Sequence, residues 1–317
     1  MKHFVLYVAI LLCGSGVHRL SAQTARSLPD VIDSIRPAVV KVYLYAEPSP
    51  NGHPEVVSAA TQQCFGGSSG CVLGTGFIVN DRGDTVTALH VVDGYQTPDG
   101  RNFPGAKQLQ AELHAAGIKS HLSIGIPTSN IDTGPIQIRS GTFGNPASVI
   151  ATDPAHDLAL IRPNDYPLHD APQTVVDIYA KSSRTKLQFV TFSNVRARDA
   201  EPIFACGYPF GEAGLVTTSG TIASAWNDAV LLRATASGFS ASQEVYNVDL
   251  RINPGNSGGP IFRLSDHSVI GVAVQSLGSL GIAVPAKFVT EFLTDQGVPW
   301  TKAEASQKQG TAKRKPK

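Results

Sequence analysis

Residues 251–261 read Arg-Ile-Asn-Pro-Gly-Asn-Ser-Gly-Gly-Pro-Ile, and this stretch sets Ser257 between glycines on a bend. A backbone amide at such a bend can meet negative charge that develops on a reacting oxygen. Ser257 is therefore a candidate nucleophile. A serine hydroxyl attacks an acyl carbon only when a base accepts its proton and fixed donors stabilise the resulting oxyanion. The remaining partners must come from elsewhere in the chain.

Two upstream segments offer these partners, a histidine first and an aspartate second. Residues 87–92 read Thr-Ala-Leu-His-Val-Val, so His90 follows a strand-like run. Residues 153–160 read Asp-Pro-Ala-His-Asp-Leu-Ala-Leu, and Asp157 stands directly before an apolar run. The order His90, Asp157, Ser257 is the one used on paired β-barrels.

The glycine and serine motif also fits a second fold. Residues 255–259 satisfy G-x-S-x-G, the nucleophile elbow of α/β-hydrolases, but that fold places an acid and then a histidine after the serine. The only histidine beyond Ser257 is His267, and Asp266 stands next to it. Neighbouring side chains on a strand point to opposite faces, so this pair is a poor acid-to-base relay. Chain order therefore favours the barrels.

Six motifs in sequence order resemble those of the trypsin-like serine endopeptidases, and more narrowly of their HtrA (Deg) branch, over roughly residues 27–295. They are Gly-Thr-Gly-Phe-Ile-Val (74–79), Thr-Ala-Leu-His-Val-Val (87–92), Asp-Leu-Ala-Leu (157–160), Gly-Tyr-Pro-Phe-Gly (207–211), Thr-Ser-Gly (218–220) and Gly-Asn-Ser-Gly-Gly-Pro (255–260). The resemblance implies an all-β fold of two six-stranded antiparallel β-barrels, with few short helices and the active site in the cleft between the barrels. It implies no cofactor, and an oligomer such as a trimer.

The resemblance also implies a role for each matching residue. Ser257 attacks a peptide carbonyl, while His90 acts as base and then as acid to the leaving amine. Asp157 orients His90 and stabilises its charged form. The backbone amides of Gly255 and Ser257 form the oxyanion hole, for which glycine is suited because a side chain at residue 255 would hinder the required peptide geometry.

Other residues compete for some of these roles. Asp153, Asp93 and Asp165 are rivals of Asp157. Asp153 can instead cap the turn before Pro154, and Asp93 is too near His90 in sequence to be an independent support for it. We expect the two other histidines of these segments, His156 and His267, to lie on the surface.

The pocket for the substrate residue that precedes the cut bond is expected around Arg251 and Ile252, six and five residues before the nucleophile. The charge of Arg251 could favour acidic side chains, but long arginine side chains commonly extend into solvent, and we favour that interpretation. The opposite wall, formed by Val274, Gln275 and Ser276, belongs to a small and apolar run. It implies a preference for modest aliphatic side chains.

Short strands with turn signals between them dominate the remaining chain, as in sandwiches and barrels. We expect strands at residues 38–45, 76–79, 85–89, 147–151, 158–161, 187–192, 203–206, 216–223, 245–250, 269–274 and 281–284. Helices are expected after an N-cap at Ser27, over residues 107–116 and over residues 285–293. A stretch at about residues 95–144 exceeds the family pattern and is predicted to be an insertion that restricts access to the site.

The two ends of the chain differ from its body. Residues 1–22 have the layout of a signal peptide, which predicts an exported chain, periplasmic or secreted; an uncleaved membrane anchor is the alternative. The protease domain is expected over residues 23–300. HtrA relatives commonly carry a PDZ module after the protease, and we expect none here. Residues 301–317 form a basic tail, expected to be disordered, which could touch anionic surfaces weakly.

Charge and cysteine usage restrict the function classes. The chain of 317 residues has a net charge of +1, of which residues 1–22 carry +2 and residues 301–317 carry +5, so the body carries −6. An acidic body is not typical of nucleic-acid binding, so we expect no nucleic-acid partner. Cys64 and Cys71 could form a disulfide, whereas Cys206 is expected to be an inert core residue. The spacing of cysteines and histidines predicts no metal site.

These observations leave two function classes. The favoured one is an exported serine endopeptidase that hydrolyses peptide bonds of unfolded or exposed polypeptides through an acyl-enzyme. The alternative is a non-hydrolytic chaperone or binding protein on the same fold. An activated serine separates them, since only the first class needs it.

Overall fold

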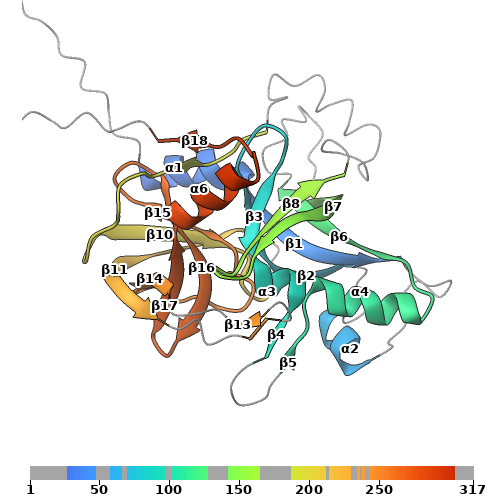
Figure 1. The fold of residues 1–317 in the computed structure, drawn as a ribbon. Coiled ribbons are helices and arrows are strands. Elements are labelled where there is room, and N and C mark those ends of the chain that lie inside the picture. Colours follow the sequence, from blue (N-terminus) through green and yellow to red (C-terminus); the bar gives the residue numbers. More distant parts are fainter. Residues whose placement is uncertain are drawn as a thin grey trace, which may run out of the picture.

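The computed structural model describes residues 27–47, 58–65, 70–96, 102–127, 142–164, 187–211, 214–229, 234–235, 238–239 and 243–303. The predicted signal peptide, residue Asp165 and most of the basic tail lie outside these ranges. Two β-barrels lie side by side within them, and the small helices lie around and between the barrels (Figure 1).

The first barrel is a closed ring of six strands in which each neighbouring pair is antiparallel. In order around the ring, the strands are β1 (Val39–Ala46), β2 (Gly70–Ile78), β3 (Thr85–Ala88), β8 (Leu158–Pro163), β7 (Thr142–Asp153) and β6 (Ser120–Pro127). A closed ring leaves no unpaired strand edge, so the strand ends are held in fixed positions. This rigidity matters where β3 and β8 meet, because His90 and Asp157 flank their paired ends.

The second barrel closes in the same way. Its ring order is β15 (Pro260–Arg263), β10 (Pro202–Gly207), β11 (Val216–Ala229), β14 (Gln243–Val248), β17 (Leu280–Pro285) and β16 (Val269–Leu277), and β16 pairs back onto β15. Two short strands, β9 (Thr191–Phe192) and β18 (Thr301–Lys302), extend the sheet beside β16 in parallel. The prediction of two six-stranded antiparallel barrels is therefore confirmed.

The local predictions differ from the structure in a few places. The strand expected over residues 187–192 is shorter, because only Thr191 and Phe192 pair. Strands β6 and β15 were not predicted from the sequence pattern. Strand β6 falls within the stretch predicted as an insertion and yet belongs to the first barrel, so that stretch is not wholly additional to the fold.

The largest hydrophobic core takes residues from both barrels, and a second cluster, which includes Ile203 and Ile222, lies within the second barrel. Phe77 of the first barrel faces Phe192 beside the second, with ring centroids 6.1 Å apart, and Phe204 stacks on Phe262 at 5.0 Å. All four rings are fully buried and belong to the same cluster of contacting apolar side chains. Burial of this kind is the main source of stability in a domain of this size, and here it also fixes how the barrels face each other.

Most helices lie at the ends and outer faces of the barrels, whereas α3 (Leu89–Asp93) lies where the two barrels meet (Figure 1). The others are α1 (Leu28–Ile35), α2 (Ala59–Phe65), α4 (Ala106–Ala115) and α6 (Ala286–Asp295), with short 3₁₀ turns at Arg36–Ala38 and Pro209–Gly211. The predicted N-cap at Ser27 is confirmed, because Ser27 and Asp30 form a capping box. The two other expected helices match α4 and α6 within one or two residues.

A third, small sheet joins the two barrels. Strands β4 (Tyr95–Gln96) and β5 (Asn102–Phe103) follow α3, and β4 pairs with β12 (Ala234–Thr235), which in turn pairs with β13 (Gly238–Phe239). Strands β12 and β13 belong to the connection between β11 and β14 of the second barrel. Segments more than a hundred residues apart in the sequence therefore meet below α3 (Figure 1).

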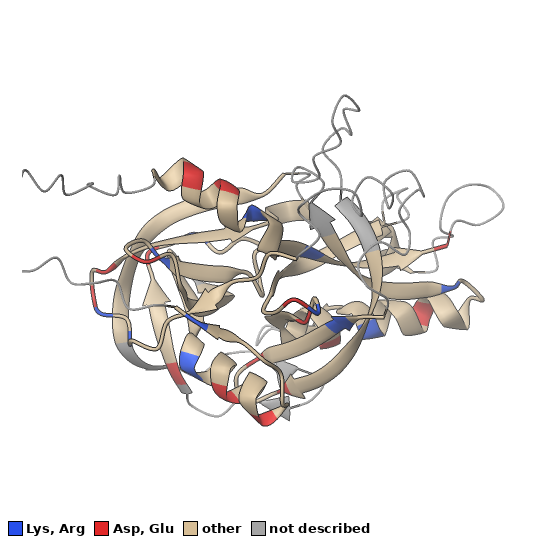
Figure 2. Cartoon of the chain, turned by 90° about the horizontal axis from the view of Figure 1, so that it is seen from above, with Lys and Arg blue, Asp and Glu red and all other residues tan. Residues whose placement is uncertain are grey.

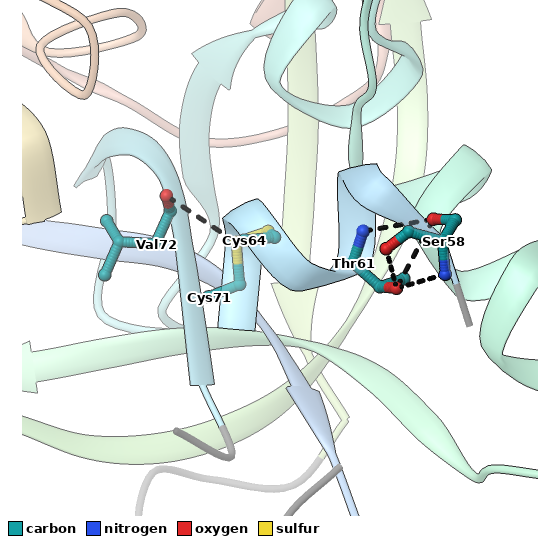
Figure 3. The surroundings of a disulfide bond; sticks show 5 residues. All are labelled: Ser58, Thr61, Cys64, Cys71 and Val72. Carbon is teal, nitrogen blue, oxygen red and sulfur yellow. Dashed lines mark hydrogen bonds between the residues drawn. A yellow bond between two sulfur atoms is a disulfide. The ribbon is translucent and has the colours of Figure 1, made fainter. Parts of the chain in front are cut away.

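The cysteines divide as the sequence suggested. Cys64 of α2 and Cys71 of β2 form a disulfide, with their Cα atoms 5.2 Å apart, which ties the helix to the first barrel (Figure 3). The bonded pair packs with Leu44, Leu109 and Leu113 in a satellite core under α2 and α4. Cys206 is a buried free thiol, and burial raises its pKa to about 11, so it is an inert core residue at neutral pH.

Charged residues of both signs are spread over the described helices and turns around the barrels (Figure 2). In the described part of the chain, no group of three or more histidine, cysteine, aspartate or glutamate residues has a metal-binding arrangement. None of the helices in these ranges has the length and apolar character needed to cross a bilayer.

Candidate active site

Where β3 ends and β8 begins, the fold joins His90 to Asp157. The register of the two strands pairs Ala88 with Leu158, and the Leu89 amide donates to the Asp157 carbonyl at 2.9 Å. One carboxylate oxygen of Asp157 accepts from the His90 backbone amide at 2.9 Å, and the other lies 2.7 Å from Nδ1 of the His90 ring. Both residues are buried.

This geometry decides the chemistry of the imidazole. A carboxylate is an acceptor, so Asp157 fixes the proton of a neutral His90 on Nδ1 and makes Nε2 the basic nitrogen. The backbone of Asp157 adopts a left-handed conformation, with φ at 52°, which is uncommon for a residue other than glycine. Such conformations concentrate at functional sites, where surrounding contacts maintain them.

The rival aspartates have other partners. Asp153 lies 2.6 Å from Nδ1 of His156 and accepts from the His156 amide within the turn. Burial alone would raise the pKa of Asp153, but the hydrogen bonds and charge of His156 outweigh it and hold that pKa below its usual range. Asp93 pairs with Lys107 at 2.5 Å. Among the described candidates, Asp157 is the carboxylate that contacts His90.

Neither of the two other histidines is fully exposed. The His156 ring is about one quarter exposed and stacks on Phe288 of α6, with ring centroids 4.0 Å apart. His267 is half-buried in the turn after β15 and has a φ of 58°. The expectation of surface positions therefore holds only in part.

Ser257 lies on a turn that its glycines make possible. Gly255 has a φ of 95°, and a Cβ on it would collide with the Tyr208 carbonyl. Gly258 has a φ of 83°, and a Cβ there would collide with the Thr87 hydroxyl. The Gly258 amide donates to the Ala273 carbonyl at 2.7 Å, which ties the turn to β16. Only glycine fits both positions.

The peptide between Pro254 and Gly255 has a fixed orientation. The Pro254 carbonyl accepts from the Phe210 amide at 2.7 Å, and the described chain contains no cis peptide bond. A trans peptide holds its C=O and N–H on opposite sides, so the Gly255 N–H points away from Phe210. Within the described residues, neither the Gly255 amide nor the Ser257 amide donates to a protein acceptor.

Thr75 of β2 connects the turn that carries Ser257 to the first barrel. Its amide donates to the Ser257 carbonyl at 2.9 Å, and its hydroxyl donates to the Gly255 carbonyl at 2.6 Å. The same hydroxyl accepts from the Tyr208 amide at 3.0 Å. In the sequence, Thr75 stands out only as part of the Gly-Thr-Gly-Phe-Ile-Val motif (74–79). The flanking Gly74 and Gly76 were the available signal, because glycine within a strand marks a close approach of another backbone.

His90 and Ser257 line the same cavity, whose volume is about 490 Å³. Its walls include His90 from the first barrel and Gly255 and Ser257 from the second. Cys64 and Cys71 form part of its wall, so the disulfide holds α2 beside the site. The structure therefore brings the predicted base and nucleophile into one cavity, with Asp157 behind the base.

The five residues predicted for the substrate pocket do not lie in one pocket. Arg251, Ile252 and Ser276 line a separate cavity of about 910 Å³, together with residues 218–220. Arg251 is exposed, as favoured from the sequence, and Ile252 is buried. Val274 is fully buried in the main core and Gln275 is almost so. The apolar wall expected from Val274 therefore faces the core.

The family model of the trypsin-like peptidase domain matches residues 74–272. The chain belongs to the trypsin-like peptidase domain family. This match includes the His90, Asp157 and Ser257 segments in the order that the structure brings together. The resemblance to the trypsin-like family that the motifs carried is therefore confirmed.

Similar curated proteins include HtrA and DegP-like serine proteases. The chain is 27% identical over 286 residues to "Serine protease HTRA3" of Rattus norvegicus, which covers 89% of the chain and 48% of the relative. It is 32% identical over 161 residues to a "Probable periplasmic serine endoprotease DegP-like" of Brucella suis biovar 1, covering 48% of the chain and 26% of the relative. The chain spans about half the length of HTRA3.

A solved structure supports the fold alone. "HtrA-type protease AlgW with decapeptide" superposes with a TM-score of 0.52 at 18% identity, over 85% of the chain and 67% of that structure. This trypsin-like peptidase domain therefore has the barrel architecture of the HtrA-type proteases, as its resemblance implied.

Proposed function

We propose that this trypsin-like domain is a serine endopeptidase in which Ser257, His90 and Asp157 form the catalytic triad. The single observation that carries the proposal is the shared cavity, in which the Asp157-bound His90 and Ser257 lie with two amides that have no protein acceptor among the described residues. General base, nucleophile and oxyanion donors are the groups that acyl transfer requires.

The reaction follows from this arrangement. Nε2 of His90 takes the Ser257 proton as the oxygen attacks a peptide carbonyl, and the amides of Gly255 and Ser257 receive the oxyanion. Imidazolium forms beside the Asp157 carboxylate, whose negative charge stabilises it. His90 then gives the proton to the leaving amine, and water attacks the acyl-enzyme with His90 again as base.

Polypeptides that are unfolded or exposed are the proposed substrates, because the motifs resemble those of the HtrA branch. The cavity takes residues from both barrels, so a bound polypeptide would meet His90 and Ser257 together. The names of the DegP-like relatives include the word periplasmic, which supports export of this chain together with the signal-peptide layout of residues 1–22. A trimeric assembly and weak contact of the basic tail with anionic surfaces remain proposals from the resemblance and the tail's charge.

A fluorophosphonate probe tests the proposed function directly, because it reacts only with an activated serine. We expect labelling of the wild-type chain and none of Ser257→Ala, with peptide turnover lower by about 10⁶. Ser265→Ala is the matched control, since Ser265 is an exposed serine in the turn after β15. A folded wild-type chain that resists the probe would instead favour the non-hydrolytic binding protein.

A further inference from the structure

Exposed aromatic side chains line the active-site cavity. Six large apolar side chains are exposed in the described part of the chain, and two of them, Phe103 and Phe210, belong to the wall of the cavity that holds His90 and Ser257. Phe103 is 38% exposed. Single exposed apolar residues are common on protein surfaces, but an aromatic ring beside a reactive cavity has a ligand within reach.

A hairpin with a narrow neck positions Phe103. The hairpin leaves α3 at Gly94 and returns to α4 at Gly105, and these glycines touch so closely that a Cβ on either would collide with the backbone of the other. Gly94 also has a φ of 75°. The Lys107 to Asp93 ion pair joins the two helices next to this neck. The base of the hairpin is therefore fixed relative to His90.

Three rings form a chain from the catalytic base into the cavity. Tyr95 meets the His90 ring edge to face, with centroids 5.3 Å apart and planes at 87°. Phe103 stacks on Tyr95, with centroids 4.7 Å apart and planes at 11°. These are favourable aromatic geometries, so each ring holds the next in place. Both Tyr95 and Phe103 line the cavity.

The hairpin is also linked to the second barrel. Tyr95 pairs with Thr235 of β12, and Phe103 pairs with Tyr95 on the other side of β4. The aromatic wall therefore lies in a sheet to which both barrels contribute. A polypeptide in the cavity would meet this wall next to the base that acts on it.

We propose that Tyr95 and Phe103 form a specificity subsite for an aromatic or bulky apolar side chain of the polypeptide substrate, close to the bond that is cut. The proposal rests on the proposed peptidase function. The partly exposed Phe103 ring would lose its remaining contact with water when such a side chain covers it, and stacking would add to this gain. A charged side chain would lose hydration at the same position.

This subsite is distinct from the pocket expected around Arg251 and Val274. It uses residues of the stretch at about 95–144 that exceeds the family pattern, and it selects by an aromatic surface rather than by a small aliphatic wall. Residues of the stretch at about 95–144 would then bind the substrate, in addition to restricting access to the site.

The test compares cleavage of peptide libraries by the wild type, Phe103→Ala and Phe189→Ala. Phe189 is the matched control because its exposed fraction is also 38% and it is absent from the cavity wall. We expect the wild type to prefer Phe, Tyr or Leu over Ser or Asp at one position near the cut bond, by about 10-fold in kcat/KM. Phe103→Ala should lose this preference, and Phe189→Ala should keep it.

Two readouts separate selectivity from a general defect. Tyr95→Phe keeps the ring stack and should preserve the preference, whereas Tyr95→Ala should abolish it. A role of Tyr95 in holding His90 alone would lower kcat for all peptides equally and leave the preference unchanged in Phe103→Ala. That result would overturn the proposal.

Fluorophosphonate labelling distinguishes failure of the subsite from failure of the enzyme. If Phe103→Ala labels like the wild type and its preference is unaltered, the subsite is wrong and the peptidase function stands. If the wild type neither labels nor cleaves, the proposed function has failed, and the subsite proposal fails with it.

Discussion

The two barrels hold their parts of the site by different physical means. In the first barrel, His90 and Asp157 meet because the end of β3 lies beside the start of β8, with Ala88 opposite Leu158. In the second barrel, Ser257 lies on an irregular turn whose glycines adopt positive φ values. The proposed base is thus positioned by strand register, and the proposed nucleophile by close backbone contacts that only glycine permits.

This difference indicates how each half of the site fails. On the first side, a change of one atom in the carboxylate can alter proton placement without moving the backbone. On the second side, a change of one methyl group must displace the backbone itself. The first kind of defect affects chemistry alone, and the second affects chemistry through geometry.

The largest effect is expected from Asp157→Asn, apart from removal of the nucleophile. The carbonyl oxygen of the introduced side-chain amide would keep the bond to the His90 backbone amide that one carboxylate oxygen now makes, which places the NH₂ group against Nδ1. That donor forces the imidazole proton onto Nε2, where the ring can no longer accept from Ser257. We expect kcat to fall by about 10⁴ at pH 7, measured with a peptide substrate.

An unchanged unfolding midpoint in Asp157→Asn would show that the loss is chemical. Asp153→Asn is the matched control, since Asp153 holds His156 in the same turn and does not contact His90. Equal loss of activity in both variants would mean that the turn, and not the contact with His90, is what matters.

On the other side of the site, Gly255→Ala should cost about 10²–10³ in kcat, the range for loss of one oxyanion donor. The added Cβ collides with the Tyr208 carbonyl and disfavours the φ of 95° that orients the Gly255 amide. Gly297→Ala is the control for backbone strain alone. Gly297 has a φ of 64° and open space where a Cβ would stand, so this variant is strained but should keep kcat. Substantial kcat in a folded Gly255→Ala would argue against this amide as a donor.

Asp84 is buried in the first barrel away from the site, so its substitution should affect stability. Burial would raise its pKa, but hydrogen bonds from Arg162 and Asn80 and the charges of Arg162 and Arg82 outweigh that effect and lower it. We expect Asp84→Asn to lower the free energy of unfolding by about 3 kcal/mol near pH 7, the low end for a buried pair, because the two arginines are partly exposed.

The lowered pKa of Asp84 determines how the stability difference between the wild type and Asp84→Asn changes with pH. A lowered folded-state pKa contributes stability above the unfolded pKa, and this contribution is lost as pH falls through the folded pKa. The difference between wild type and Asp84→Asn should therefore be largest above about pH 4 and shrink in stronger acid, measured by urea unfolding. Asp33→Asn should change the stability little, because the Asp33 side chain is 75% exposed. A difference that grows in acid would refute the ion-pair account.

Short motifs and chain order were sufficient to predict the barrels and the pair of His90 and Asp157. They were sufficient because residue types with a chemical role stand next to strands with clear apolar runs. The sequence could not supply β6, since its eight residues include polar side chains and a glycine, and it is a strand only because β1 and β7 pair with it. Tertiary pairing overrides local preference in such segments.

The contacts around Thr75 were equally inaccessible. Its partners Gly255 and Tyr208 are 180 and 133 residues away, so no local pattern connects them. The ring chain from His90 to Phe103 depends likewise on a neck between Gly94 and Gly105 that exists only after folding. Sequence thus locates reactive groups well and the contacts that hold them poorly.

The smallest loss of activity is expected at the seam between the barrels, by which we mean the contacts that Thr75 makes to Gly255, Ser257 and Tyr208. Thr75→Val keeps the shape of the side chain but removes the bond to the Gly255 carbonyl and the acceptor of the Tyr208 amide. Because the Thr75 amide still binds the Ser257 carbonyl, the turn should shift rather than collapse. We expect kcat/KM to fall by about 10-fold in Thr75→Val, while the fluorophosphonate probe still labels Ser257 and no other serine. Thr75→Ser restores the hydroxyl and should restore kcat/KM. If Thr75→Ser is as impaired as Thr75→Val, the methyl group and not the hydroxyl matters, and the seam is held by packing rather than by hydrogen bonds.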